Sequence, residues 1–284
     1  MNKNETWTTL KVLDWTKDFL ASRGVDNARL EAEWLLCAAT GLDRVGLYLN
    51  FEKPLNNEEL GRYRDMVARR GRREPLQHIL GTQEFCGLEF EVTTDVLIPR
   101  HDTETLVQKA LEMVPHAHNV LDIGTGSGCI AVSMGTLLPD ARVTAIDISP
   151  AALLVAGRNA ARHGVEVELL QGSLFEPVAG RVFDLIVSNP PYIPRQEIET
   201  LQAEVKDYDP RLALDGGLDG LDFYRTLIPS APEYLVSGGL LIVEIGAGQD
   251  SDVAAMFRAC GEYRSVSMSE DGSGITRVVW GQKI

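Results

Sequence analysis

The apolar residues of the first quarter of the chain recur every three to four positions, which is the spacing of one face of an α-helix. Gly24 is expected to end the first helix, Asn27 to cap the second, and Asn56 to begin the third. The pattern predicts a small helical domain over residues 1–73. The three apolar faces are Val12, Trp15 and Phe19; Leu30, Trp34, Leu35 and Ala38; and Leu60, Tyr63 and Val67.

Residues 74–95 change to short pieces that favour β-structure. The pieces at 77–80 and 88–92 are separated by Gly81 and Gly87, which are typical turn residues. We predict that residues 74–95 form a β-hairpin linker.

From residue 96 to 284, short apolar runs alternate with helical patterns. The runs expected as strands are 119–123, 142–146, 167–171, 182–188, 240–245, 263–268 and 276–280. Asp102 or Thr103 is expected to cap the helix that follows them, and further helices are expected around 221–235 and 249–260. This alternation predicts an α/β fold with a doubly wound, mainly parallel seven-stranded sheet.

Composition narrows the class of protein. The chain of 284 residues carries a net charge of −14, which disfavours general nucleic-acid binding because that requires a cationic footprint. The four cysteines show neither metal-ligand spacing nor a disulfide framework, so we expect no metal and a reducing cytoplasm. No apolar run reaches the ~18 residues of a membrane span.

A glycine loop follows the strand at 119–123. Its three glycines allow tight turns and let a ligand approach the backbone amides. A dinucleotide fingerprint would need glycine at Cys129, so pyrophosphate binding is not indicated, whereas a sulfonium cofactor has no pyrophosphate to bind. The loop residues predicted to bind a cofactor are Gly124, Thr125, Gly126, Ser127 and Gly128.

Other candidate cofactor residues stand at strand ends. Asp147 ends the second strand of the sheet, where a carboxylate accepts from ribose hydroxyls. Asp122 is expected near the cofactor's ammonium group, and Leu174 or Phe175 over its adenine ring, although core packing explains Phe175 equally well. Arg100 is a candidate to meet a carboxylate, that of the cofactor included.

The strand at 182–188 runs into Asn189-Pro190-Pro191-Tyr192. Prolines cannot join a ladder, so the strand stops there and Asn189 presents its carboxamide at a rigid edge. Its oxygen and the Pro190 carbonyl can accept from an NH2 group, while the Tyr192 ring can cover a flat nitrogen. These residues are therefore the candidate catalytic and substrate-binding residues, and Asn189 is also expected to meet the cofactor.

The tetrapeptide resembles the signature of class I methyltransferases that modify planar nitrogens. Nearly the whole chain resembles the HemK/PrmC family of release factor glutamine methyltransferases. The motifs that carry this likeness are residues 74–81, 97–104, 122–128, 189–193 and 209–221. Two positions depart from the family pattern: His101 stands where proline is usual, and Ser173 where many relatives have an acid.

The resemblance implies a Rossmann-like methyltransferase domain over 96–284 and a substrate-docking role for the helical domain. It implies S-adenosyl-L-methionine as the cofactor, and transfer of its methyl group to N5 of the glutamine in the Gly-Gly-Gln loop of peptide chain release factors. We expect no stable nucleic-acid binding and no membrane association.

Three alternatives remain open at this point: an adenine-N6 nucleic-acid methyltransferase, methylation of another protein glutamine, and a non-enzymatic adaptor. The six arginines between Arg62 and Arg73 are another open point. They form either a solvated helix face or a docking patch for an acidic partner.

Overall fold

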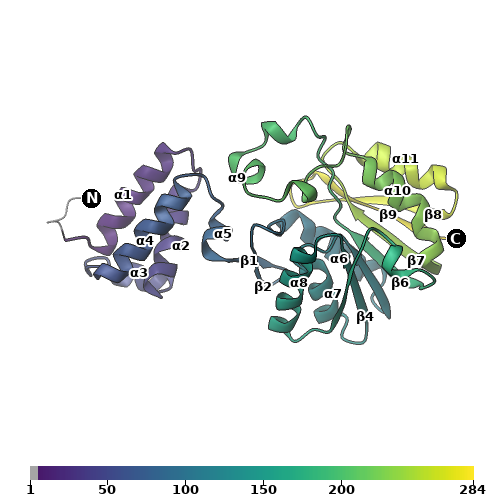
Figure 1. The fold of residues 1–284 in the computed structure, drawn as a ribbon, viewed down its shortest axis with the longest axis horizontal. Coiled ribbons are helices and arrows are strands. Elements are labelled where there is room, and N and C mark those ends of the chain that lie inside the picture. The colour runs from purple at the N-terminus through teal and green to yellow at the C-terminus, as the bar shows by residue number, and fades with distance from the viewer. Residues whose placement is uncertain (1–5) are drawn as a thin grey trace. The chain divides into compact units, whose positions relative to one another are not determined.

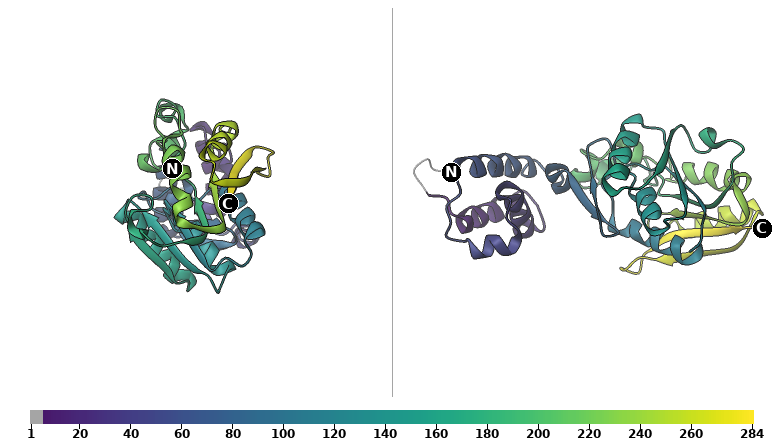
Figure 2. Two further views of the ribbon diagram at one scale, coloured as in Figure 1. Left: turned by 90° about the vertical axis from the view of Figure 1, so that its right-hand side faces the viewer. Right: turned by 90° about the horizontal axis from the view of Figure 1, so that it is seen from below.

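The computed structural model describes residues 6–284, which divide into two compact units (Figure 1). The first unit contains the residues up to Gly81 together with Gln202–Tyr208, and the second contains Thr82–Leu201 and Asp209–Ile284. Helices build the first unit, whereas the second is a sheet covered by helices on both faces (Figure 2).

The first unit is held together by an apolar core to which each long helix contributes. Leu13, Leu36 and Tyr63 come from different helices and are all buried. Helix α4 begins at a capping box, in which Asn56 accepts from Glu59 N and Glu59 accepts from Asn56 N. The helices are α1 Thr9–Ser22, α2 Ala28–Thr40, α3 Arg44–Leu49, α4 Asn57–Arg70, α5 Leu76–Leu80 and α9 Ala203–Lys206.

One local prediction for this part of the chain is wrong, and another is confirmed in position only. Residues 77–80 were expected as a strand but lie in helix α5, because Ile79 buries its side chain in the helical core and Gly81 ends the helix in the left-handed conformation. The hairpin strands are β1 Thr82–Phe85 and β2 Leu88–Glu91. Asn27 does precede α2, yet its side chain makes no capping bond within the described residues.

The second unit contains the predicted seven-stranded sheet, in the order β5-β4-β3-β6-β7-β9-β8. The strands β5, β4, β3, β6 and β7 are parallel, and β9 is antiparallel to both of its neighbours. Its strands are β3 Asn119–Ile123, β4 Arg142–Asp147, β5 Val167–Gln171, β6 Phe183–Ser188, β7 Leu235–Glu244, β8 Tyr263–Glu270 and β9 Thr276–Lys283.

Helices cover both faces of this sheet because neighbouring strand residues point to opposite sides. Val120 and Leu185 pack with α6 and α7, whereas Leu121 and Ile186 pack with α10 and α11. The helices are α6 Glu104–Met113, α7 Cys129–Leu137, α8 Pro150–His163, α10 Asp222–Ser230 and α11 Asp250–Cys260. Short 3-10 helices span His101–Thr103, Glu176–Val178, Ile198–Thr200, Arg211–Ala213 and Ala231–Tyr234.

The strand order places a crevice at the carboxyl ends of the central strands. Strand β3 pairs with β4 on one side and with β6 on the other, so the chain connections run in opposite directions from β3. In open α/β sheets, ligands bind at such a switch point, outside the carboxyl ends of the strands. The glycine loop after β3, Asp147 at the end of β4 and Asn189 after β6 all lie at this carboxyl end of the sheet.

Candidate active site

A cavity of about 340 Å³ lies at the carboxyl ends of β3, β4 and β6. This volume is in the range of small-molecule sites, which begins at ~300 Å³. The structure brings together most of the predicted site residues at this cavity. Those that line it are Arg100, Gly124, Thr125, Gly126, Ser127, Asp147, Leu174, Asn189 and Pro191.

The glycine loop exposes backbone to the cavity. Gly124, Gly126 and Gly128 have φ of +75°, +54° and +80°, a backbone region that residues with a side chain rarely adopt. A Cβ atom on Gly124 or Gly126 would meet no atom within 4 Å among the described residues, whereas one on Gly128 would lie 3.0 Å from the Ala156 Cβ. The first two glycines therefore leave room for a ligand, and Gly128 permits close packing of α7 against α8.

Asp147 holds the loop from the side. Its Oδ2 accepts from Gly126 N at 2.8 Å, and its Oδ1 accepts from Ser149 N at 2.9 Å. The cap of α8 is Ser149, whose hydroxyl accepts from Ala152 N. Each Asp147 oxygen can accept a further bond, so the carboxylate can serve ribose hydroxyls while it braces the loop.

Asp122 lies beneath the loop and does not line the cavity within the described chain. It is fully buried, and its Oδ2 accepts from the Thr125 hydroxyl at 2.6 Å. Its Oδ1 has no hydrogen-bond partner within residues 6–284. Burial raises the pKa of Asp122 to about 7, although the Thr125 hydroxyl opposes this rise.

Leu174 and Phe175 have different environments. Leu174 lines the cavity with φ of +49°, whereas Phe175 is buried and stacks on Tyr234 with ring centroids 4.2 Å apart. Leu174 is therefore the residue of the two that can cover a ligand, and Phe175 belongs to the core.

Asn189 projects from the end of β6 into the lining of the cavity. Its Nδ2 donates to the Thr103 hydroxyl at 3.1 Å, which leaves Oδ1 available to a ligand. Pro191 lines the cavity beside it, whereas Pro190 is buried. The backbone beyond is braced, since Ile193 N donates to Leu214 O at 3.0 Å.

Tyr192 is not among the described residues that line the cavity. Its hydroxyl donates to Glu244 Oε1 at 3.3 Å, and its carbonyl accepts from Gln249 Nε2 at 2.9 Å. Burial raises the pKa of Tyr192 well above its usual range, so the hydroxyl keeps its proton and acts as a donor.

Three residues of the site were not identified from the sequence. Thr103 was expected as a possible helix cap, but its hydroxyl contacts Asn189 and makes no capping bond in the described part of the chain. Glu244 ends β7 and is almost completely buried, which raises its pKa to about 7. Asp209 is the third. Thr103 and Asp209 lie within the motifs at 97–104 and 209–221, but neither was assigned a role in the site, and Glu244 was noted only as part of an apolar strand.

Arg100 meets a carboxylate of the chain itself. Its Nη2 lies 2.6 Å from Asp209 Oδ2, and the Asp209 side chain is buried. Burial raises the pKa of Asp209 to about 6, while the charge of Arg100 opposes this rise. The pair links the segment before α6 to the segment that follows Tyr208.

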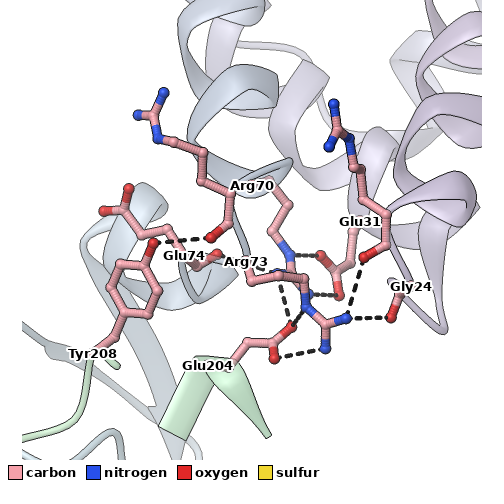
Figure 3. Close-up of polar contacts among 9 residues, drawn as sticks. Gly24, Glu31, Arg70, Arg73, Glu74, Glu204 and Tyr208 are labelled. Carbon is pink, nitrogen blue, oxygen red and sulfur yellow. Dashed lines mark hydrogen bonds and ion pairs between the residues drawn. The ribbon is translucent and has the colours of Figure 1, made fainter. Parts of the chain in front are cut away.

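Several arginines of the 62–73 cluster are engaged by carboxylates within the first unit (Figure 3). Arg70 is buried between Glu31 and Glu204, and Arg73 contacts Glu204 through two nitrogens. Arg69 pairs with Glu74. The prediction of a uniformly solvated helix face is therefore wrong for Arg70, and the docking reading does not extend to these internal pairs.

Within residues 6–284, no helix combines the length and the apolar character needed to cross a membrane. In the same part of the chain, no group of three or more His, Cys, Asp or Glu side chains is arranged to hold a metal ion.

Comparisons with known proteins agree with this architecture. Residues 11–81 match the family model of the PrmC N-terminal domain, and residues 89–219 match the methyltransferase small domain. The release factor glutamine methyltransferase of Geobacter sulfurreducens is 61% identical over 280 residues, which cover 99% of this chain and 98% of the relative. That of Moorella thermoacetica is 47% identical over 262 residues, 91% of this chain and 92% of the relative.

A solved methyltransferase structure from Pyrococcus furiosus resembles the fold with a TM-score of 0.53 at 19% identity, over 76% of this chain and 98% of that one. The mainly parallel seven-stranded sheet shows a Rossmann-like fold, and the match to the methyltransferase small domain, with the full-length relatives, places the chain among class I methyltransferases. The full-length identities narrow the assignment further. The chain belongs to the family of release factor glutamine methyltransferases, as the sequence motifs predicted.

Proposed function

We propose that the protein transfers a methyl group from S-adenosyl-L-methionine to the side-chain amide nitrogen of the glutamine in the Gly-Gly-Gln loop of peptide chain release factors. The observation that carries this proposal is the position of Asn189. Its carboxamide lines the cavity at the end of β6, with Nδ2 held by Thr103 and Oδ1 left to accept from a substrate. The names of the full-length relatives point to a release factor glutamine as the substrate, and the resemblance of the motifs implies the Gly-Gly-Gln loop.

The residues around the cavity fit the proposed cofactor. Gly124 and Gly126 leave open space beside the backbone, Asp147 keeps acceptor capacity for a ribose diol, and Leu174 offers an apolar surface to an adenine ring. When bound, S-adenosyl-L-methionine supplies an electrophilic methyl group on a sulfonium centre. Asp122 is buried beneath the loop, and its Oδ1 has no hydrogen-bond partner among residues 6–284, in keeping with its proposed position near the cofactor's ammonium group.

The contribution of the protein to the reaction is mainly alignment. An amide nitrogen is a weak nucleophile because its lone pair is delocalised into the carbonyl group. Asn189 Oδ1 and the Pro190 carbonyl each accept a hydrogen bond from one N–H group of the substrate amide. These two bonds fix the amide nitrogen and stabilise the positive charge that develops on it. Tyr192 is proposed to pack on the amide plane. Orientation of this kind can supply ~7–11 kcal/mol of the barrier.

The adenine-N6 alternative uses the same four residues, because an adenine amine is also a planar nitrogen. The net charge of −14 disfavours it, since a nucleic-acid substrate would be repelled rather than drawn to the surface. A protein substrate carries no such obligatory charge.

The four cysteines are unpaired, which fits our proposal of a cytoplasmic location.

The helical unit is proposed to help dock the release factor. Trp34, Tyr48 and Leu49 are exposed on it, with 45%, 47% and 81% of their surfaces accessible. Arg62 and Arg64 are exposed residues of α4. Reversal of both charges should weaken the affinity for a release factor if this part of the cluster takes part in docking, and unchanged affinity would remove it from the proposal.

A transfer assay tests the proposed function. The protein is incubated with labelled S-adenosyl-L-methionine and either a release factor, its Gln→Ala loop variant, or duplex and single-stranded DNA and RNA. We expect label on the first substrate alone. Label on nucleic acid would favour the adenine alternative, and binding of a release factor without any transfer would favour an adaptor.

A further inference from the structure

The carboxamide of Asn189 has two ends of nearly equal shape and opposite hydrogen-bonding character, because its oxygen accepts whereas its NH2 group donates. A substrate nitrogen that carries two N–H bonds is attracted by the oxygen and repelled by the NH2 group. Whatever fixes the rotation of this side chain therefore decides whether the site can hold such a nitrogen.

Thr103 contacts one end of the carboxamide. Asn189 Nδ2 donates to Thr103 Oγ1 at 3.1 Å, and Thr103 is only 2% exposed. A hydroxyl that accepts one bond still has its own proton to donate. The direction of the Asn189–Thr103 bond therefore depends on an acceptor on the far side of Thr103.

Glu244 is our candidate for that acceptor. It ends β7, which pairs with the strand that leads into Asn189, and it is 1% exposed. Tyr192 donates to its Oε1, whereas its Oε2 has no hydrogen-bond partner among residues 6–284 and so has the capacity to accept from a hydroxyl. The Thr103 and Tyr192 hydroxyls and the charge of Arg277 counter the rise in the pKa of Glu244 that burial causes.

We propose that Glu244 and Thr103 are positioning residues that hold the Asn189 carboxamide in a single rotation. In its ionised form the Glu244 carboxylate only accepts, so it draws the Thr103 proton and leaves the Thr103 oxygen to accept from Nδ2. Oδ1 is then turned toward the substrate. The same carboxylate accepts from the Tyr192 hydroxyl, so one buried group positions both Asn189 and Tyr192, the first and last residues of the Asn-Pro-Pro-Tyr segment. This inference rests on the proposed function and adds to it the means of orientation.

Substitution of Thr103 tests the central bond. Thr103→Val keeps the shape of the side chain and removes the hydroxyl, so both rotations of Asn189 become accessible. We expect kcat for release factor methylation to fall roughly tenfold, the equivalent of about one net hydrogen bond, while KM and the affinity for S-adenosyl-L-methionine change little. Thr103→Ser restores the hydroxyl and should restore most of kcat.

A matched control separates orientation from general damage. Thr144 is also buried and also donates its hydroxyl to a carboxylate, that of Glu168 at 3.0 Å, but it does not line the cavity within the described residues. Thr144→Val should therefore leave kcat unchanged. If Thr103→Val keeps full kcat, or if folded Thr103→Ser loses as much as Thr103→Val, the inference is wrong.

A spectroscopic readout avoids any dependence on turnover. In 15N-labelled protein, the side-chain NH2 signals of Asn189 can be assigned by their loss in Asn189→Asp. One of the two protons should exchange slowly with solvent in the unmodified protein and in Thr103→Ser, and quickly in Thr103→Val. Equal exchange in all three proteins would show that Thr103 does not hold the amide.

The role of Glu244 is tested by a double-mutant cycle. Glu244→Gln offers both a donor and an acceptor, so it no longer sets the direction of the Thr103 bond, and kcat should fall several-fold. In the Thr103→Val background, the same substitution should have a smaller effect, because residues that act through one another are not additive. Independent effects would contradict the inference, whereas absence of transfer by the unmodified protein would instead contradict the proposed function.

Discussion

At Asn189 a buried strand has just ended, two prolines stiffen the backbone, and a hydroxyl holds one end of the side-chain amide. Little is left for this side chain to rearrange when a substrate arrives, which is the condition under which a polar group accelerates a reaction most. Asn189 is only partly buried, so its removal should leave the surrounding core intact.

We expect Asn189→Ala to fold and to bind S-adenosyl-L-methionine normally while kcat falls roughly 100–1000-fold, the range for loss of one preorganised polar group. Calorimetric titration of the cofactor and single-turnover methylation of a release factor measure the two quantities separately. Full turnover in this variant would contradict the assignment of Asn189, and loss of cofactor binding would indicate a different role.

Asp122 provides a test at the residue scale that does not involve turnover. Its pKa is raised from 3.8 to about 7, chiefly by burial and to a lesser extent by the charge of Asp147. The folded state therefore holds the proton more tightly than the unfolded state does. The resulting contribution to stability is complete below about pH 4 and is lost as the pH rises through 7.

We expect Asp122→Asn to reduce the loss of stability between about pH 5 and about pH 8 by ~3 kcal/mol relative to the unmodified protein. Urea unfolding at both pH values measures the difference. Glu244 and Asp209 also have raised pKa values and titrate in this range, but both proteins contain them, so their contributions cancel. Identical pH dependence in the two proteins would mean that Asp122 is not protonated in the folded state.

At the scale of single elements, the hydrophobic pattern predicted the strands of the sheet better than it predicted the short helices. The strands at 119–123 and 167–171 match the structure to the residue, because each is a short β-forming segment that a glycine follows. Residues 77–80 were assigned to a strand because their helical packing is decided by a core that other helices supply. Helix α3 is too short to show a period, and it depends on the Asp43 cap.

The same reasoning explains what was missed in the site. The glycine loop, Asp147 and Asn189 stand at strand ends, so the topology of the sheet brings them together. Thr103 contacts Asn189 across 86 positions of sequence, and no local pattern encodes that pairing. Thr103 precedes a helix, where its residue type favours a cap, and the tertiary contact with Asn189 replaces that local bond.

Gly128 tests the packing of the elements beside the cavity. It combines φ of +80° with an approach that would bring a Cβ within 3.1 Å of the Ala156 Cα. Gly164 ends α8 with φ of +66°, but a Cβ there would meet no described atom within 4 Å. The two glycines therefore separate the cost of the backbone conformation from the cost of the contact.

We expect Gly164→Ala to lower the free energy of unfolding by ~1–2 kcal/mol, the cost of the left-handed conformation. Gly128→Ala should lower it by ~1–3 kcal/mol more, because α7 and α8 must move apart. Chemical unfolding of both variants gives the comparison. Equal losses would show that the contact with Ala156 relaxes without cost.

At the scale of the whole molecule, the chain leaves the second unit after Leu201, contributes Gln202–Tyr208 to the helical unit, and returns at Asp209. Within the helical unit, Glu204 accepts from Arg70 and Arg73, and the Tyr208 hydroxyl donates to Arg72 O at 3.0 Å (Figure 3). Arg70 is 5% exposed. A buried guanidinium that loses a carboxylate partner is strongly destabilising, whereas an exposed pair contributes little.

We therefore expect Glu204→Gln to lower the stability of the helical unit by ~1–3 kcal/mol, since Arg70 keeps Glu31 but loses half of its neutralising charge. Amide hydrogen exchange should rise in residues 202–208 and in α4. Glu199→Gln is the matched control, because Glu199 and Arg211 form an exposed pair in the same connection. If both variants exchange like the unmodified protein, Glu204 does not anchor this segment, and the contacts of Tyr208 and the backbone must be sufficient to hold it in the helical unit.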